Sequence, residues 1–293
     1  MRVGFLGLGF MGTPMALNLA HKFPLTVWNR TASKYPALTQ AGAKIGDTPA
    51  AVAHQSDVIF TMLFDGPALI SIFNNDFKSA LRGKILINTS SIPLEVSKQV
   101  ADHVHQAGGK FLEMPVSGSK IPAEQGKLVG LMAGDPAVAE RMRAVVEPLT
   151  TAAVYCGPIG SGLKTKYAVN LYLNTMTVAL AESFSLARAQ SLDLDAFGQV
   201  LDAGPMASAY SKIKVAKIVN EDWNPQASMK DCYNSMQLIT EATKRANVQS
   251  PLAELCRSIY GQASDGGLSE QDMIAVYKIF QPTPFSETNV RNT

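Results

Sequence analysis

Hydrophobic residues in the first half of the chain occur in short runs, and longer amphipathic stretches separate these runs. The runs are rich in valine, isoleucine, leucine and phenylalanine and end at glycine, proline, asparagine or aspartate, as buried strands do. We expect strands at Val3–Leu6, Leu25–Trp28, Val58–Leu63, Ile85–Asn88, Phe111–Val116, Leu128–Met132 and Ala153–Tyr155. Helices are expected near residues 12–20, 32–41, 67–73, 94–107 and 136–148. This alternation predicts βαβ units built on a parallel sheet.

The second half of the chain, after Gly160-Ser161-Gly162, has a helical pattern in place of strand-like runs. A long helix is expected from about Leu163 to Gln190, and turn-forming residues separate it from those that follow. These helices are expected near residues 193–203, 208–219, 227–245, 252–264 and 270–280. The sequence therefore predicts an α/β domain over residues 1–162. An all-helical domain follows over residues 163–293, and a long interdomain helix begins it.

Composition and charge describe an ordinary globular chain. Of its 293 residues, 46% are hydrophobic and 17% are charged, so it can bury a core without disulfide or metal support. The 26 basic and 24 acidic residues nearly balance, and no dense basic run occurs. This balance argues against nucleic acid or an anionic membrane as the partner and favours a small molecule.

The cysteine pattern and the chain ends bear on the cellular compartment. Cys156, Cys232 and Cys256 are odd in number and widely spaced, which fits neither a disulfide framework nor a metal site. No apolar run of membrane-spanning length and no signal peptide is evident, so we expect a cytoplasmic protein. The polar tail Gln281–Thr293 is expected to lack regular structure.

A glycine motif marks the first strand-to-helix turn. Its residues, G-x-G-x-x-G, are Gly7, Leu8, Gly9, Phe10, Met11 and Gly12. Gly7 permits a tight turn, Gly9 lets the backbone approach a pyrophosphate, and Gly12 lets the helix pack closely on the strand. The alternative is a glycine-rich turn without a ligand, but the position between the first strand and first helix favours a cofactor. We therefore expect a doubly wound, Rossmann-type domain that binds a dinucleotide.

The end of the second strand bears on the choice of dinucleotide. An NAD enzyme places an acidic residue there, on the ribose 2′-hydroxyl, whereas this chain has Asn29, Arg30 and Thr31. Asparagine removes the repulsion of a 2′-phosphate, arginine can grip that phosphate with its planar fork, and threonine adds a hydroxyl. The pattern favours NADP, although Arg30 as a solvated loop residue is the open alternative.

A nicotinamide enzyme that reduces a carbonyl needs a proton donor of its own. The four histidines lie at element ends or on a polar helix and are poor candidates. Lys166 and Asn170 stand four residues apart and so project from one face of the expected long helix. Lys166 would protonate the substrate oxygen and Asn170 would orient it or the substrate. The alternative is a lysine that extends along a solvated face.

A second polar cluster, Ser117-Gly118-Ser119-Lys120, follows the apolar strand around residue 111. Hydroxyls and backbone N–H groups beyond the carboxyl end of a strand suit a carboxylate ligand, because open α/β sheets bind ligands there. A simple turn is the alternative.

Together these motifs resemble the β-hydroxyacid dehydrogenases, which include 3-hydroxyisobutyrate dehydrogenase, tartronate semialdehyde reductase and the glyoxylate/succinic semialdehyde reductases. The family's N-terminal signature is similar to Phe5–Ala16, and its substrate motif to Pro115–Gly118. Its catalytic motif G-x-G-x-x-x-K-x-x-x-N is similar to Gly160–Asn170, and its C-terminal Lys-Asp pair to Lys230-Asp231. The resemblance covers residues 1 to about 280, with the motifs in the family's order.

The resemblance implies roles for further residues. It places Met62 and Leu63 against the cofactor, Ser91 near the nicotinamide ribose, Lys230 on the cofactor and Asp231 at the edge of the substrate site. Trp223 stands where relatives usually have phenylalanine, and its larger ring would reshape the substrate pocket. The resemblance also implies a homodimer or homotetramer.

Within the family, the clusters at Ser117–Lys120 and Asn29–Thr31 are most similar to those of the NADPH-dependent glyoxylate/succinic semialdehyde reductases. We therefore expect an NADPH-dependent reductase of small carboxylate-bearing aldehydes or keto acids, with Lys166 as proton donor. An imine reductase of the same architecture stays open, although such enzymes generally lack this lysine. A non-catalytic NADPH-binding protein also stays open, but the intact Lys166 and Asn170 argue against it.

Overall fold

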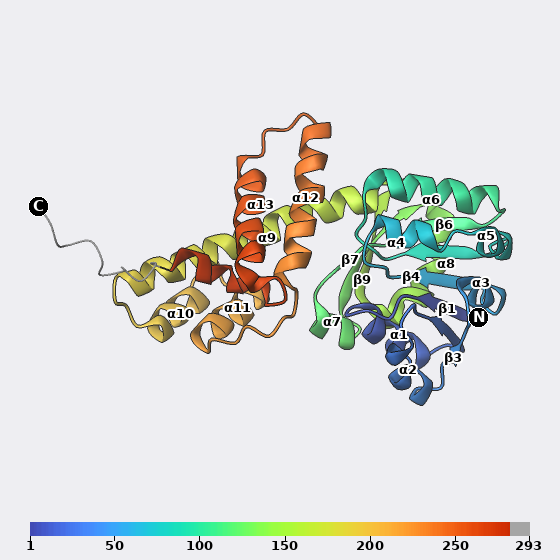
Figure 1. Cartoon of the computed structure of the whole chain (residues 1–293), viewed down its shortest axis with the longest axis horizontal. Helices are drawn as coiled ribbons and strands as arrows, with labels where there is room; N and C mark the ends of the chain where they lie inside the picture. Colours follow the sequence, from blue (N-terminus) through green and yellow to red (C-terminus); the bar gives the residue numbers. More distant parts are fainter. Residues whose placement is uncertain (282–293) are drawn as a thin grey trace, which may run out of the picture. The chain divides into compact units, whose positions relative to one another are not determined.

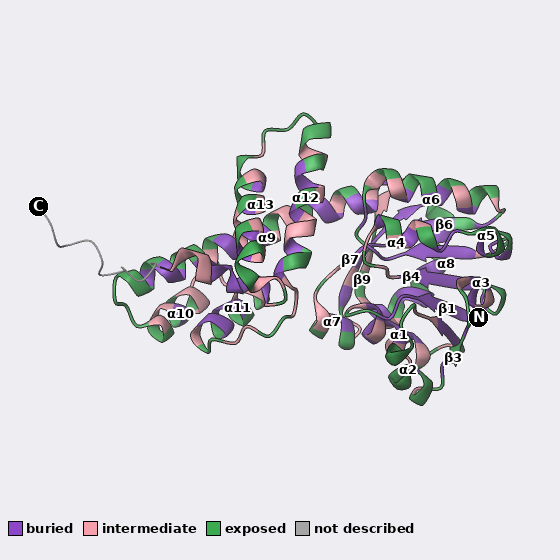
Figure 2. Cartoon of the chain, in the orientation of Figure 1, coloured by how far each residue is buried: buried purple, intermediate pink, exposed green. Residues whose placement is uncertain are grey.

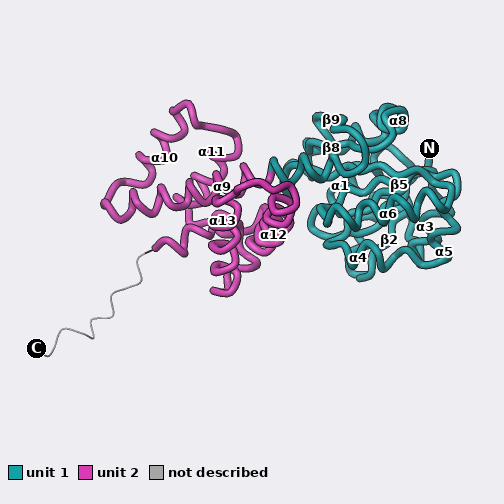
Figure 3. The backbone as a smooth tube through the Cα atoms, turned by 90° about the horizontal axis from the view of Figure 1, so that it is seen from above, with its two compact units in different colours: residues 1–169 teal, residues 170–293 magenta. Residues whose placement is uncertain are grey.

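The computed structural model of the protein describes residues 1–281. Most of the tail expected to be irregular, Gln281–Thr293, therefore lies outside the described residues. The chain divides into two units, residues 1–169 and residues 170–293 (Figure 3). The predicted domain boundary between residues 162 and 163 stays a prediction, because one helix, α9 (Ser161–Ala189), contributes to both units.

The strands of the first unit form one sheet (Figure 1). Its order is β3-β2-β1-β4-β5-β6-β8-β7, and β9 pairs with β8. The strands are β1 (Val3–Leu6), β2 (Leu25–Trp28), β3 (Lys44–Ile45), β4 (Val58–Thr61), β5 (Ile85–Asn88), β6 (Lys110–Glu113), β7 (Val116–Ser117), β8 (Leu128–Gly134) and β9 (Thr150–Gly157).

The sheet is parallel over β1 to β6, as expected, and departs from parallel pairing at β8. Strands β1 to β6 pair in parallel, but β8 runs antiparallel to β6 and β7 and parallel to β9. Residues 118–127 connect β7 to β8 and contain only the short helix α7 (Lys120–Glu124). A parallel return needs a longer crossover, so the chain turns back beside itself. The expected strand Phe111–Val116 is also divided, because Pro115 has no N–H group to donate to a ladder.

Helices cover both faces of this sheet. They are α1 (Gly12–Ala20), α2 (Pro36–Gln40), α3 (Pro49–His54), α4 (Gly66–Ser71), α5 (Asn75–Ala80), α6 (Leu94–Gln106), α7 and α8 (Pro136–Val146), with 3₁₀ helices η1 (Ala32–Lys34) and η2 (Glu147–Leu149). Met15 and Leu19 of α1 and Met142 of α8 join Phe5 and Phe60 in one core cluster. Successive strand residues point to opposite faces, and a Cβ on Gly4 would contact Val52 of α3 on the other side. Figure 2 shows the resulting buried sheet between partly exposed helices.

Several short elements had no counterpart in the predicted pattern. These are β3, α3, α5 and α7, and the expected helix over 32–41 is divided into η1 and α2. Two of the missed helices do have a local signal. Thr48 accepts a hydrogen bond from the N–H of Ala51 and is followed by Pro49, and Asn74 accepts one from Phe77. An N-cap residue predicts a helix start even where the helix is too short for periodicity, and a proline directly after it, as at Pro49, strengthens this signal.

The second unit contains helices and no strand within its described residues. Residues 170–189 of α9 are followed by α10 (Leu194–Ala203), α11 (Ala209–Val219), α12 (Met229–Arg245), α13 (Pro251–Ala263), η3 (Ser264–Leu268) and η4 (Met273–Phe280). Helices α12 and α13 pack side by side (Figure 1). The expected last helix begins later than residue 270, because Asp272 has a non-helical backbone, with a ψ of 144°, and caps η4 by accepting the N–H of Ile274. The predicted fold class, a doubly wound α/β domain followed by a helical one, is confirmed.

No helix in the described part of the chain has the length and apolarity needed to cross a membrane.

Candidate cofactor and active site

Two glycines of the first loop are required by the fold, and the third is not. Gly7 has a φ of +104°, and a Cβ there would collide with the carbonyl oxygen of Met62. A Cβ on Gly12 would collide with the Gly7 carbonyl oxygen, so α1 can approach β1 only without a side chain there. A Cβ on Gly9 would meet no described atom within 4 Å. This open space at the start of α1 fits the approach of a dinucleotide pyrophosphate.

Asn29 ties the end of β2 to the glycine loop. Its Oδ1 accepts a hydrogen bond from the N–H of Leu8 at 2.9 Å, and its Nδ2 donates to the carbonyl of Thr31 at 3.0 Å. The hydroxyl of Tyr35 accepts from the N–H of Asn29 at 2.9 Å and donates to its carbonyl at 2.8 Å. Arg30 and Thr31 beside it are exposed. The sequence motif gave no sign of Tyr35, because its contact depends on how the 3₁₀ turn η1 folds.

The ends of β4 and β5 meet next to this loop. Leu63 approaches Gly7, and its N–H donates to Oγ of Ser90 at 2.8 Å. The hydroxyl of Thr89 donates to the carbonyl of Thr61 at 2.8 Å, next to Met62. Ser91 follows this network and is exposed. Hydrogen bonds between side chains and backbone therefore hold Met62 and Leu63 at one edge of the sheet, and Ser91 follows the residues that make these bonds.

The start of α9 packs on the Pro115–Gly118 segment. A Cβ on Gly162 would lie 2.6 Å from the carbonyl oxygen of Leu131 and 3.3 Å from Cδ of Pro115, so this glycine permits a close approach. Gly118 has a φ of +128°, a conformation that strongly favours glycine. Ser117 and Ser119 on either side of it are half-buried. The structure thus brings the predicted substrate motif and the start of the predicted catalytic helix together.

Lys166 lies on α9 one turn after Gly162, and only 7% of it is exposed. The next residue, Tyr167, donates a hydrogen bond from its hydroxyl to the carbonyl of Ile92 at 2.6 Å. This bond connects α9 to the loop that carries Ser91. Lys164, two residues before Lys166, is exposed.

Asn170 belongs to the second unit and follows Lys166 by one turn of the same helix. Its Nδ2 donates to Oγ of Ser235 at 2.9 Å. Its Oδ1 is buried and has no hydrogen-bond partner within residues 1–281. Asparagine oxygens withdrawn from water are normally bonded, so this atom is an acceptor available to a ligand.

Trp223 is held by two neighbours within the second unit. Its ring stacks on Tyr277, with centroids 6.2 Å apart and planes at 17°, and Nζ of Lys278 lies 4.6 Å from the ring centroid. Neither contact was predicted, because the three residues are far apart along the chain or lie outside any motif. Asp231 and Lys230, at the start of α12, are exposed, and Oγ of Ser228 donates to Oδ2 of Asp231 at 2.8 Å.

Two lysines support the segment that carries Trp223. Lys214 pairs with Asp272, which also accepts the N–H of Gln226 at 2.9 Å. Burial lowers the pKa of Lys214. Lys217 donates to Oδ2 of Asp222 at 2.7 Å and thereby lowers the pKa of that carboxyl to about 2. Both pairs lie in the second unit.

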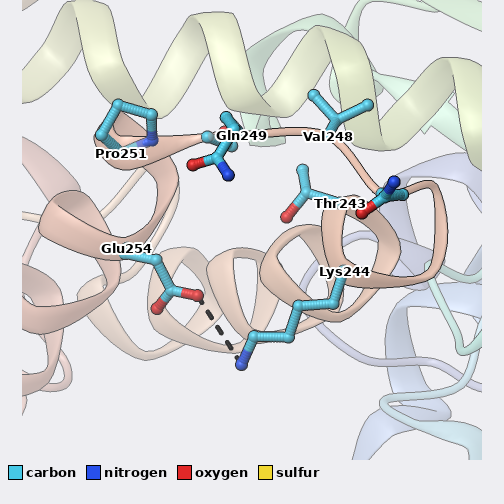
Figure 4. A pocket seen from close by; sticks show the side chains of 8 residues that line it. Thr243, Lys244, Val248, Gln249, Pro251 and Glu254 are labelled. Carbon is cyan, nitrogen blue, oxygen red and sulfur yellow. Dashed lines mark ion pairs between the residues drawn. The ribbon is translucent and has the colours of Figure 1, made fainter.

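Two other features lie apart from the predicted site residues. A polar cavity of about 390 Å³ sits at the turn between α12 and α13, where Nζ of Lys244 is 3.7 Å from Oε1 of Glu254 (Figure 4). None of the predicted site residues, all of which the structure describes, lines this cavity. Residues 1–281 contain no cluster of three or more histidine, cysteine, aspartate or glutamate side chains suited to a metal.

Family models match almost the whole described chain. Residues 2–157 match the NAD binding domain of 6-phosphogluconate dehydrogenase, and residues 160–280 match the NAD-binding domain of NADP-dependent 3-hydroxyisobutyrate dehydrogenase. The chain belongs to the β-hydroxyacid dehydrogenase family. This β-hydroxyacid dehydrogenase is therefore an NAD(P)-dependent oxidoreductase, and the predicted family and enzyme class are confirmed.

Individual relatives cover nearly the full chain. Glyoxylate/succinic semialdehyde reductase 1 of Arabidopsis thaliana is 34% identical over 280 residues, which are 94% of this chain and 97% of that protein. The chloroplastic reductase 2 of the same plant is 31% identical over 278 residues, or 94% and 78% of the two chains. The solved structure of Mycobacterium tuberculosis 3-hydroxyisobutyrate dehydrogenase with L-serine has a TM-score of 0.85 and 24% identity, over 96% and 100% of the chains. This last likeness supports the fold.

Proposed function

We propose that this β-hydroxyacid dehydrogenase is an NADPH-dependent reductase of small carboxylate-bearing aldehydes or keto acids, such as glyoxylate or succinic semialdehyde. The observation that carries the proposal is the burial of Lys166 on a helix whose start packs on the Pro115–Gly118 motif. A lysine spread along a solvated face would not be 93% withdrawn from water. The two Arabidopsis relatives, named for these substrates, support the same substrate class.

The preference for NADPH rests on the end of β2. Asn29 is neutral and already holds the glycine loop through Leu8, and the exposed Arg30 is available for a 2′-phosphate. Gly7 to Gly12, with Leu8, Phe10 and Met11 between the glycines, would take the pyrophosphate. Met62, Leu63, Ser91, Thr31 and Lys230 would complete the cofactor site. The bound cofactor supplies a hydride to the carbonyl carbon.

The residues of this chain bind, orient and protonate the substrate. Ser117, Gly118 and Ser119 would hold its carboxylate with hydroxyl and backbone N–H groups. Lys166 donates a proton from Nζ to the carbonyl oxygen and stabilises the developing alkoxide with its charge. The unbonded Oδ1 of Asn170 would accept a hydrogen bond from the lysine or from the substrate. Trp223 and Asp231 are proposed to select among substrates.

Cytoplasmic localisation remains a prediction, and assembly into a homodimer or homotetramer is a proposal. Side chains of the second unit support assembly, because Tyr172, Leu252 and Leu255 expose large apolar surfaces.

The test is Lys166→Ala, with Lys164→Ala on the same helix as the matched control. We expect Lys166→Ala to lower kcat by about 10²–10⁴ while the Kd for NADPH changes little. Lys164→Ala should keep its activity, because that side chain is exposed. Rates are measured as NADPH consumption with glyoxylate, succinic semialdehyde, methylmalonate semialdehyde and tartronate semialdehyde, and again with NADH. An active Lys166→Ala enzyme, or turnover of a cyclic imine but of no aldehyde, would overturn the proposal.

A further inference from the structure

Glu113, the last residue of β6, is a buried carboxyl group that the proposed reaction does not use. None of its surface is exposed. Its Oε1 accepts a hydrogen bond from Oγ of Ser97, on α6, at 2.5 Å, and Ser97 is also fully buried. Burying a carboxyl group is costly unless something compensates it. The second oxygen, Oε2, must therefore be compensated by groups other than Ser97.

Oε2 faces the start of α9. A Cβ on Gly162 would lie only 3.3 Å from it, so the missing side chain lets the helix end and the carboxyl group approach each other. Burial raises the pKa of Glu113, and the Ser97 hydroxyl and three backbone N–H groups oppose this rise. Those N–H groups belong to Gly160, Leu163 and Gly162. None of them forms a well-aligned hydrogen bond to Oε2 within the described residues. Oε2 therefore interacts with the N-terminus of α9 through all three N–H groups rather than through a single hydrogen bond.

This arrangement joins the parts of the proposed active site in the first unit. The N-terminus of a helix carries partial positive charge, which a carboxylate stabilises. Glu113 leads directly into Pro115–Gly118, Ser97 lies on α6 after the Ser91 loop, and Lys166 is one turn beyond Gly162. Two further contacts hold the same helix end. Gly160 lies against Leu94, and Tyr167 is bonded to Ile92.

We propose that Glu113 is a positioning residue that, with Ser97, holds the first turns of α9 and thereby sets Lys166 relative to the Ser117 motif. The inference rests on the proposed function, because it assigns Glu113 an effect on the reaction through Lys166. Glu113 does not touch the reacting atoms in this scheme. Its removal should therefore affect the rate when Lys166 is present and have little effect when Lys166 is absent.

A double-mutant cycle tests this coupling. Glu113→Gln keeps the size of the side chain and removes its charge, and it should lower kcat by about 10-fold or more. The Kd for NADPH should stay within about twofold, because the glycine loop is a separate part of the unit. In the Lys166→Ala background, Glu113→Gln should change the residual rate by less than about twofold. Glu147→Gln, at an exposed carboxyl group of η2, is the matched control and should leave every parameter unchanged.

Ser97→Ala provides a second variant if Glu113→Gln folds poorly. It removes the donor to Oε1 but keeps the carboxyl group, and we expect a smaller fall in kcat, of about 3-fold or more, with NADPH binding retained. Equal rate losses from Glu113→Gln in both backgrounds would overturn the inference, since they indicate a general structural role. Full activity of both Glu113→Gln and Ser97→Ala would also overturn it. A fully active Lys166→Ala enzyme would instead refute the proposed function, so the two failures are distinguishable.

Discussion

Nζ of Lys214 lies 2.6 Å from Oδ1 of Asp272, and both side chains are almost completely withdrawn from solvent. The same carboxylate accepts the N–H groups of Gln226 and Ile274, and the N–H of Asp272 donates to the carbonyl of Trp223. One buried ion pair thus connects α11, η4 and the segment that carries Trp223.

Removal of one partner of this pair should destabilise the second unit strongly. Lys214→Met leaves the Asp272 carboxylate buried without its cation, and such changes cost about 3–5 kcal/mol. Lys212→Met, at an exposed position of the same helix, is the matched control and should change stability by less than about 0.5 kcal/mol. Urea unfolding of the two variants measures the difference. Equal stabilities would show that the Lys214–Asp272 ion pair does not hold the second unit together.

The different surroundings of Gly9 and Gly12 predict different effects of the same substitution. Gly12→Ala places a methyl group on the Gly7 carbonyl oxygen and should cost about 1–3 kcal/mol of stability, as overpacking does. Gly9→Ala meets open space, so stability should change by less than about 0.5 kcal/mol. Its methyl group would nevertheless occupy the proposed pyrophosphate site, and the Kd for NADPH should rise by about 10-fold or more.

Thermal unfolding and NADPH titration separate these two effects. A Gly9→Ala protein that binds NADPH as tightly as the parent would show that the open space beside the loop is not the cofactor site.

Asn29 offers a test of cofactor choice. Asn29→Asp keeps an oxygen acceptor for the N–H of Leu8, but it loses the donor to Thr31 and adds a negative charge. Because this charge would repel a 2′-phosphate, kcat/KM for NADPH relative to NADH should fall by about 10-fold or more. Asn29→Ala is the control, since it removes the bond to Leu8 without adding charge and should weaken both cofactors alike. An unchanged ratio in Asn29→Asp would place the 2′-phosphate elsewhere.

The hydrophobic pattern of the sequence predicted those strands that are themselves short hydrophobic runs. The bounds of β1, β2 and β5 agree with the sequence, because each is a short, mostly apolar run. Strand β3 has two exposed residues, Lys44 and Ile45, and so carries no hydrophobic signal. Strand β8 reverses direction because the connection that contains α7 is short. The periodicity of hydrophobic residues carries no information about strand direction.

The same distinction applies to the candidate site: residues within a local motif were predicted, and contacts between distant residues were not. The roles of Gly7 and Gly12 follow from a motif whose spacing has a steric cause, and the structure shows that cause. The Glu113–Ser97 and Lys214–Asp272 pairs join residues 16 and 58 positions apart, so no local pattern reveals them. Both pairs become visible only when the fold brings separate elements together.

The Lys217–Asp222 pair predicts how stability depends on pH. Lys217 holds the pKa of Asp222 at about 2, below its ordinary value of 3.8. Between pH 2 and pH 3.8, the carboxyl group of Asp222 binds more protons in the unfolded chain than in the folded protein. The stability that this pair contributes is therefore complete above about pH 4 and is lost as the pH falls toward 2. Since the Asp222 side chain is 43% exposed, we expect about 1 kcal/mol from this effect after allowance for solvent screening.

Asp222→Asn should therefore be less stable than the parent at pH 6, and the gap should narrow as the pH is lowered from 4 to 2. Calorimetric melting at pH 6, 4 and 3 measures this gap, with Asp265→Asn, at an exposed carboxylate of η3, as the control. The buried Lys217 also donates to the carbonyl of Asn224 at 2.7 Å, so the segment around Trp223 keeps one anchor in the variant. A gap independent of pH would show that the loss comes from packing, and that the ion pair itself contributes nothing.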